Sequence, residues 1–403
     1  MRPRIILIST ICFFAVAAVN ALHHSRSSKQ VIYANKPVAM AQLPSPMPSD
    51  SAASRKIKLA LILDTSNSMD GLIDQAKTQL WKFVNELSKA SVDGAKPILQ
   101  IALYEYGNDG LSSRNGFVKL IASFTNDLDE ISSKLFSLST NGGSEFCGEV
   151  IQQSVSSLNW EGGENDLKII FIAGNEPFNQ GSYSYKEACS KAVNNGIYVN
   201  TIYCGAYEEG ISTFWQSGAV AGNGNYMCIE QDRKTVFYDT PYDKILDSLN
   251  TELNSTYLYY GAQAQYRQEN QYAQDNNSGY FGSANKAERS VSKAGSFYNN
   301  SSWDLVDAYN DKSIDVYKIQ NSSWPEHLRA IPIQSRILII EDMNVRRMQI
   351  KTQILDINRL RLSYIDKLKV ASGDQNSLDE AMLKAIREQA VKKGFVFDAI
   401  VSQ

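Results

Sequence analysis

Hydrophobic and polar positions along residues 56–256 alternate in blocks that predict strands and helices in turn. Short apolar runs, which are typical of strands buried on both faces, lie at 58–63, 98–106, 117–124, 168–173, 197–204 and 226–229. Between them, apolar residues at helical spacing predict helices at 70–90, 127–138, 145–158, 185–194, 208–220 and 241–253. This alternation predicts an α/β fold with a doubly wound, mostly parallel sheet and helices on both faces.

The pattern changes after residue 256. Residues 257–332 are rich in Asn, Gln, Tyr, Ser and Gly, which predicts an irregular polar extension with one short amphipathic helix at 303–308. Residues 333–403 return to helical spacing and predict a helical hairpin or a coiled-coil tail. The whole chain is therefore expected to be an α/β domain with a C-terminal helical extension.

The predicted long helix at 342–370 carries apolar residues in two rows, each with a seven-residue step. The first row is Met343, Ile350, Ile357 and Tyr364, and the second is Met348, Leu355 and Leu362. Two rows indicate two packing neighbours. An αα-hairpin with the helix predicted at 377–393 and a coiled-coil homodimer both stay open, and the arginines within the seam count against the dimer.

The N-terminus has the composition of an export signal. Residues 1–4 are basic, residues 5–19 are apolar, and small residues follow, so residues 1–21 are predicted to be a signal peptide. An uncleaved anchor is the alternative, although the apolar run is shorter than a membrane span requires. Residues 22–55, rich in Pro and Ser, predict a disordered linker. We therefore expect a periplasmic or secreted protein.

Composition excludes several kinds of chemistry. A net charge of −3 gives no reason to expect a nucleic-acid partner. The chain has three histidines, His23, His24 and His327, and two of these precede the sheet domain, so a histidine-based triad or zinc site is not expected. The cysteines remaining after signal cleavage are Cys147, Cys189, Cys204 and Cys228. In an oxidising compartment they are compatible with disulfides or with buried thiols.

The clearest candidate site follows the first predicted strand. The apolar run 59–63 stops at Asp64, and Ser66 and Ser68 follow on alternate residues before a helix begins. Ligands of parallel α/β sheets bind beyond the carboxyl ends of the strands, where these side chains are expected. One carboxylate and two hydroxyls suit a hard divalent cation such as Mg²⁺ or Ca²⁺.

This Asp-x-Ser-x-Ser pattern, with the order of elements over 56–256, resembles the metal-ion-dependent adhesion site (MIDAS) of von Willebrand factor type A (vWA) domains in exported bacterial proteins. The family usually places a threonine before its third helix, and here either Ser144 or Glu145 falls at that position. The family ends its next buried strand with Thr-Asp-Gly, whereas Gly174 stands here in place of the aspartate. The resemblance therefore implies a modified site formed by Asp64, Ser66, Ser68, Ser144, Glu145, Asn175 and Glu176.

The resemblance also implies a function. A bound Mg²⁺ or Ca²⁺ would accept a carboxylate from a protein partner, so we expect a metal-dependent protein–protein interaction module rather than an enzyme. The alternative is a metal-free scaffold of the cell envelope that presents its C-terminal helices. A hydrolase is less expected because neither Ser66 nor Cys147 has a plausible histidine base. No membrane span is expected after signal cleavage.

Overall fold

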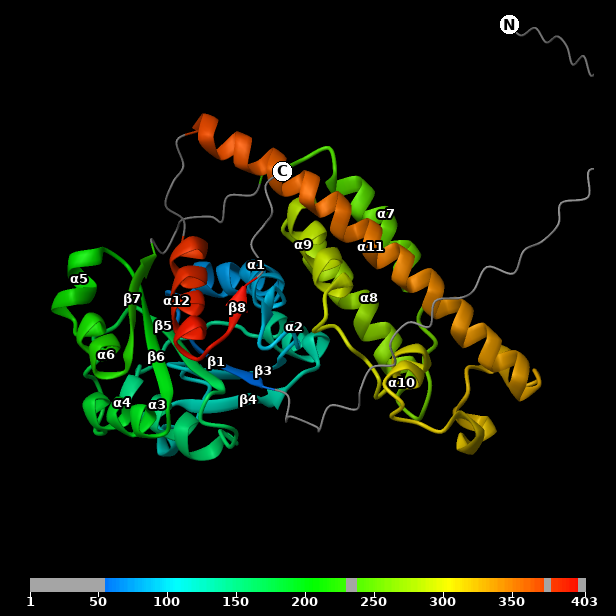
Figure 1. The fold of residues 1–403 in the computed structure, drawn as a ribbon. Helices are drawn as coiled ribbons and strands as arrows, with labels where there is room; N and C mark the ends of the chain where they lie inside the picture. Colours follow the sequence, from blue (N-terminus) through cyan, green and yellow to red (C-terminus); the bar gives the residue numbers. More distant parts are fainter. Residues whose placement is uncertain (1–54, 230–237, 373–377, 398–403) are drawn as a thin grey trace, which may run out of the picture. The chain divides into compact units, whose positions relative to one another are not determined.

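The computed structural model describes residues 55–229, 238–372 and 378–397, which belong to one compact unit, residues 51–403. Its centre is a six-stranded sheet in the order β4-β3-β1-β5-β6-β7 (Figure 1). The strands are β1 (Lys56–Asp64), β3 (Ile98–Tyr106), β4 (Val118–Thr125), β5 (Leu167–Gly174), β6 (Ile197–Cys204) and β7 (Asn223–Ile229). Only β4 pairs antiparallel within this sheet. The predicted doubly wound, mostly parallel sheet is confirmed.

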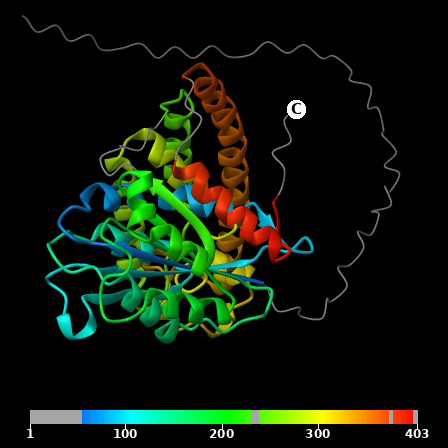
Figure 2. The ribbon, with the colours of Figure 1, turned by 90° about the vertical axis from the view of Figure 1, so that its left-hand side faces the viewer.

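Helices cover both faces of the sheet (Figure 2), and β1 supplies residues to both cores. Leu59, Leu61 and Leu63 belong to the core beneath α1 (Asp70–Leu87), α2 (Leu128–Phe136) and α7 (Asp243–Asn254). Ala60 and Ile62 belong to the opposite core beneath α3 (Cys147–Ser157), α4 (Tyr185–Asn194) and α6 (Trp215–Ala221). A strand buried on both faces needs apolar residues at every position, which explains the unbroken run after Lys58.

The prediction of a single helix at 208–220 is wrong, because the structure has two helices there. The first is α5 (Tyr207–Ser212), and the second, α6, begins at Trp215. Between them Phe214 adopts a left-handed conformation with φ of 72°, which an uninterrupted right-handed helix excludes. This break lets Trp215 enter the core, where its indole packs against Phe178.

The expectation of an irregular polar extension at 257–332 is wrong for its first half, whereas the short helix expected at 303–308 corresponds to α10. Its first half forms α8 (Ala264–Tyr280) and α9 (Ser283–Ala294), followed by α10 (Leu305–Asn310). The polar side chains of α9 are largely buried, and so is one side of α8: Asp275 accepts hydrogen bonds from Arg289, Lys293 and Asn250. Polar composition predicted irregular structure, but these helices bury charges that are paired with one another. Short 3₁₀ turns are found at Ser113–Asn115, Val316–Lys318, Asn321–Ser323 and Glu326–Leu328.

The C-terminal part is helical as predicted, but its packing differs from the expected hairpin. Helix α11 (Ile333–Ser372) packs against α7, α9 and α10. Helix α12 (Leu378–Lys392) packs on β7 and α1, and Gln389 exchanges hydrogen bonds with Asn200 of β6. A short strand, β8 (Val396–Phe397), then pairs with β2 (Ala90–Ser91). Thus α12 packs on the sheet domain, and α11 packs on α7 of that domain and on α9 and α10 of the extension.

Cys147, Cys189 and Cys204 are buried thiols, and the half-buried Cys228 donates a hydrogen bond from its thiol to the Gly205 carbonyl. The register of β6 and β7 aligns Cys228 with Tyr203, while Cys204 aligns with Ile229. The two cysteines therefore point to opposite faces of the sheet, which excludes a bridge between them in this fold. The predicted signal peptide at 1–21 lies outside the described residues, as does all but Arg55 of the predicted linker. Within the described part of the chain, no helix combines the length and apolar character needed to cross a membrane.

Candidate functional site

The candidate site lies at the carboxyl edge of the sheet, where β3, β1 and β5 end side by side. Asp64 pairs with Tyr106 in the parallel register, and on the other side Leu63 pairs with Ala173. After Asp64 the chain turns at once, because Oδ1 of this carboxylate accepts a hydrogen bond of 2.7 Å from the Ser66 amide. This turn keeps both Asp64 and Ser66 buried at the strand end.

Glu145, and not Ser144, is the residue from the neighbouring loop that reaches this carboxylate. Glu145 is 4% exposed, whereas Ser144 is half-buried. Gly107 explains how the two acids approach: a Cβ at this glycine would lie 2.6 Å from Asp64 Oδ1 and 2.8 Å from Glu145 Cγ. Gly107 also has φ of 77°, so it is required both for its backbone conformation and for the space that the acids occupy.

While both acids are ionised, several buried oxygen atoms of the site have no hydrogen-bond donor among the described residues. These atoms are Asp64 Oδ2, Ser66 Oγ, Glu145 Oε2 and Asn175 Oδ1. With one acid protonated, Asp64 and Glu145 share a hydrogen bond instead. Leaving such atoms unsatisfied costs about 1–3 kcal/mol each, and more for charged groups. Carboxylate, hydroxyl and amide oxygens are the ligands that Mg²⁺ and Ca²⁺ prefer, so the donor set fits a hard cation. The site has two buried carboxylates, and no group of three or more Asp, Glu, His or Cys that could hold a metal is found among the described residues.

Glu145 opposes the ionisation of Asp64, whereas the hydrogen bond between the two acids favours the ionised form of Glu145. Burial raises the pKa of Asp64 well above its usual range, and a hydrogen bond and the charge of Glu145 raise it further. Burial also raises the pKa of Glu145, with the charge of Glu176 acting in the same direction. A cation placed between the acids would reverse this balance, because an opposite charge favours the ionised form.

The remaining predicted residues surround these acids at the surface. The Asn175 amide donates a hydrogen bond of 3.0 Å to the Ser68 hydroxyl, which links the loops after β5 and β1. Glu176 is exposed, and its carboxylate accepts a hydrogen bond from Gln180. Asn175 therefore belongs with the buried oxygens, while Ser68 and Glu176 lie at the rim. No polar contact places Ser144 in the site.

Sequence reasoning missed Tyr106. Its side chain is fully buried, and its hydroxyl donates a hydrogen bond of 3.1 Å to the Ala173 carbonyl. The same hydroxyl occupies the space where a Cβ of Gly174 would lie. The volume that a side chain at Gly174 would need is therefore filled by a phenol from β3. Gly174 was the sequence feature that could have indicated such a residue. A glycine in a packed site leaves a volume that a neighbouring side chain has to fill.

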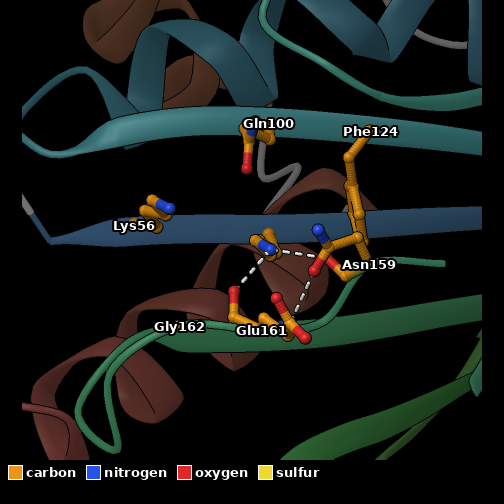
Figure 3. A pocket seen from close by; sticks show the side chains of 7 residues that line it. Lys56, Gln100, Phe124, Asn159, Glu161 and Gly162 are labelled. Atoms are coloured by element: carbon orange, nitrogen blue, oxygen red, sulfur yellow. Dashed lines mark hydrogen bonds between the residues drawn. The ribbon is translucent and has the colours of Figure 1, made fainter.

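A pocket of about 290 Å³ lies far from these residues, near the start of β1 (Figure 3). The ammonium of Lys58 donates hydrogen bonds to the Asn159 and Glu161 carbonyls, at 2.5 and 2.7 Å. It also lies over the Phe124 ring. The lysine thus already has hydrogen-bond partners within the chain. Through them it links β1 to the segment before β5, which is a structural role.

Comparison with known proteins bears on the fold. No family model and no curated protein matches the chain. Among solved structures, BatB, a conserved hypothetical protein from Bacteroides thetaiotaomicron, is 18% identical over 43% of this chain and 90% of its own, with a TM-score of 0.35. The SpRpn10 VWA domain is 14% identical over 44% and 90%, with a TM-score of 0.34.

A von Willebrand factor type A structure from Catenulispora acidiphila is 12% identical over 44% of this chain and 39% of its own, with a TM-score of 0.32. The similarity found is therefore to vWA structures, as the sequence analysis expected. It concerns less than half of the chain, and the strand order and helix placement of residues 56–254 are what define the fold. The function has to be derived from the residues of the site.

Proposed function

We propose that this chain is an exported protein-interaction module whose sheet edge binds a divalent cation, and that the cation accepts a carboxylate from a protein partner. The supporting observation is the set of buried oxygens on Asp64, Ser66, Glu145 and Asn175 that have no hydrogen-bond donor among the described residues while both acids are ionised. Folding buries these atoms next to one another at the end of β1, an arrangement that is costly unless another group satisfies them.

The ligand set leaves room for an acidic partner, because Mg²⁺ and Ca²⁺ take six or more oxygen ligands. Asp64 and Glu145 together carry two negative charges when ionised, which balance one divalent cation. Neutral Ser66 and Asn175 supply further oxygens, and Gly174 adds none where vWA domains carry an aspartate. A cation held by two carboxylates and neutral groups retains affinity for another anionic ligand. The exposed rim at Ser68 and Glu176 leaves this side open to a partner.

Binding is a better proposal than catalysis. Burial raises the pKa of the Cys147 thiol well above its usual range, which makes it a poor nucleophile. The hydroxyl of Ser66 has no neighbouring base other than the acids themselves. His327 lies in the 3₁₀ turn Glu326–Leu328 of the extension, not at this sheet edge. We therefore propose no reaction for the site.

Thermal unfolding of the full chain in Mg²⁺, Ca²⁺ or chelator tests the proposal. A cation at 100 times its dissociation constant should stabilise the wild-type fold by about 2.7 kcal/mol relative to chelator. Asp64→Asn should lose this stabilisation. In chelator the same variant should be more stable than wild type, because the substitution removes an acid whose ionisation the fold opposes.

Asp109→Asn is the matched control, since Asp109 is an exposed acid next to Gly142 on the same edge. It removes one nearby charge without altering the buried oxygens, so it should keep the response to cations. A wild-type melt that neither ion shifts at millimolar concentration would contradict the proposal. That result would favour the metal-free scaffold, which the buried ion pairs between Arg347 of α11 and Asp304 and Asp307 support.

A further inference from the structure

The face of α11 that points away from the protein carries an ordered apolar seam. Its residues are exposed, apart from Leu362, which is half-buried: Leu338, Glu341, Val345, Met348, Thr352, Leu355, Arg359 and Leu362. The exposed fractions of the four largest apolar contributors are 65% for Leu338, 57% for Val345, 59% for Met348 and 40% for Leu355. Successive members lie alternately three and four residues apart, the spacing of a coiled-coil seam.

This seam is separate from the face that holds α11 to the rest of the chain. The buried face consists of Ile340, Arg347, Ile350, Ile354 and Arg361, which meet α7, α9 and α10. In Figure 1, α11 runs along the outside of these helices. The first apolar row expected from the sequence thus has its neighbour within the chain through Ile350 and Ile357. The second row, Met348, Leu355 and Leu362, belongs to the seam. Met348 and Leu355 of this row are exposed to solvent.

We infer that the seam binds the same seam of a second copy of this chain, in antiparallel orientation, with the two-fold axis passing beside residue 350. In that register Leu338 lies opposite Leu362, and Val345 opposite Leu355. Met348 then lies opposite Thr352. Every apolar residue of the seam gains an apolar or methyl-bearing partner, and the interface is self-complementary, as a two-fold dimer requires.

Charge selects this orientation. The antiparallel register places Glu341 of each copy opposite Arg359 of the other, so both charges within the seam are matched. A parallel, in-register dimer would place Glu341 against Glu341 and Arg359 against Arg359, which like-charge repulsion disfavours. Within one chain Glu341 accepts a hydrogen bond from Tyr309 and Arg359 pairs with Asp356, and both contacts lie at the surface. Exchanging such surface contacts for the pairs of a dimer costs little.

Sedimentation of the full chain over a range of concentrations, with charge reversals, tests the orientation. We expect wild type to dimerise, and Glu341→Arg or Arg359→Glu alone to weaken the dimer at least tenfold. The two reversals combined should restore it, because the pair is again matched across the axis. Arg346→Glu, an exposed reversal outside the seam, should have no effect. A wild-type monomer at all concentrations, or a dimer that survives both single reversals, would overturn the inference, whatever else covers the seam.

Cysteine cross-linking gives an independent measurement. In the antiparallel register two copies of residue 338 are about 36 Å apart along the helix axis, from a rise of about 1.5 Å per residue. Leu338→Cys alone should therefore give no disulfide-linked dimer, whereas a mixture of Leu338→Cys and Leu362→Cys chains should give one. A cross-link between two copies of Leu338→Cys would show a parallel dimer and refute the inference. Unchanged far-ultraviolet circular dichroism of each variant controls for folding.

Discussion

The hydroxyl of Tyr106 lies in the space that a side chain at Gly174 would need. Tyr106 ends β3 and Gly174 ends β5, on either side of β1, so the phenol passes beside Asp64 to reach the Ala173 carbonyl. A Cβ at Gly174 would overlap this hydroxyl and lie 3.1 Å from Asp64 Oδ2. The end of β5 and the end of β3 therefore share one space, which the phenol of Tyr106 occupies and a side chain at Gly174 would have to enter.

This shared space predicts a specific coupling between the two positions. Gly174→Ala should destabilise the protein by about 1–3 kcal/mol, the usual cost of overpacking a well-packed site. In a Tyr106→Phe background, which lacks the obstructing oxygen, the same substitution should cost less. Urea denaturation of the four proteins of this double-mutant cycle measures the difference. Equal costs in both backgrounds would mean that the hydroxyl is not what excludes a side chain at Gly174.

Substitutions at Glu145 and at Ser144 should have opposite effects on the thermal stabilisation by Mg²⁺ or Ca²⁺. If Glu145 holds the cation, Glu145→Gln should abolish most of the thermal stabilisation by Mg²⁺ or Ca²⁺, while Ser144→Ala should retain it. The physical reason is position: Glu145 Oε2 is buried beside Asp64, whereas Ser144 makes no polar contact with the site. Melting curves with and without chelator decide the matter. If Ser144→Ala lost the stabilisation by cations and Glu145→Gln kept it, Ser144 and not Glu145 would be the ligand.

Asp275 should make the protein sensitive to acid. Burial alone would raise the pKa of Asp275, but the charges of Lys293 and Arg289 outweigh it, and the pKa lies below its ordinary value. A depressed pKa contributes stability that is present above the unfolded value, near 4, and is lost as pH falls below it. Asp275→Asn should therefore destabilise the protein by about 3–5 kcal/mol at pH 7. Its free energy of unfolding should then fall less steeply than that of wild type between pH 4 and pH 2.

Chemical denaturation at a series of pH values measures this difference. Glu269→Gln, an exposed substitution on the same helix, is the control and should follow the wild-type pH profile. A variant at Asp275 with the full acid sensitivity of wild type would show that other carboxylates determine it.

The sequence predicted the sheet well because buried parallel strands leave a plain pattern. The run after Lys58 is apolar at every position, since β1 packs against helices on both faces. Asp64 and Ser66 were predictable for the same reason: polar residues that end such a strand lie at the ligand-binding edge. Glu145 was predicted only as one of two neighbours, because a register ambiguity of one residue cannot be resolved without the loop geometry.

What the sequence did not predict depends on pairing across long separations. Arg289, Lys293 and Asp275 are buried in helices whose polar composition predicted irregular structure. Their ion pairs appear only when α9 folds against α8, and one of them, Arg289 with Asp129, also requires α2. Tyr106 could not be identified from the sequence, because it meets Gly174 only when the sheet brings the ends of β3 and β5 together. The position of α12 was missed because a helical pattern identifies an apolar face, not the surface that the face covers.

Arg347 should be the residue that fixes α11 to the extension. Its guanidinium donates hydrogen bonds to Asp304 at 2.5 Å, to Asp307 at 2.6 Å and to the Thr256 carbonyl at 2.6 Å, and it lies over the Tyr257 ring. Arg347→Met would leave two buried acids without a cation, so it should cost about 3–5 kcal/mol. Arg347→Lys keeps the charge without the planar fork and should cost less.

Arg346→Met is the matched control for this prediction, because the neighbouring Arg346 is exposed and its loss should change stability by no more than about 0.5 kcal/mol. Guanidinium denaturation compares the variants, and amide hydrogen exchange locates the effect. Exchange should accelerate in α10 and in the middle of α11, while the amides of β1 should keep wild-type protection wherever the sheet domain stays folded. Equal stability of Arg347→Met and Arg346→Met would show that apolar packing at Ile340, Ile350 and Ile354 suffices to hold the helix.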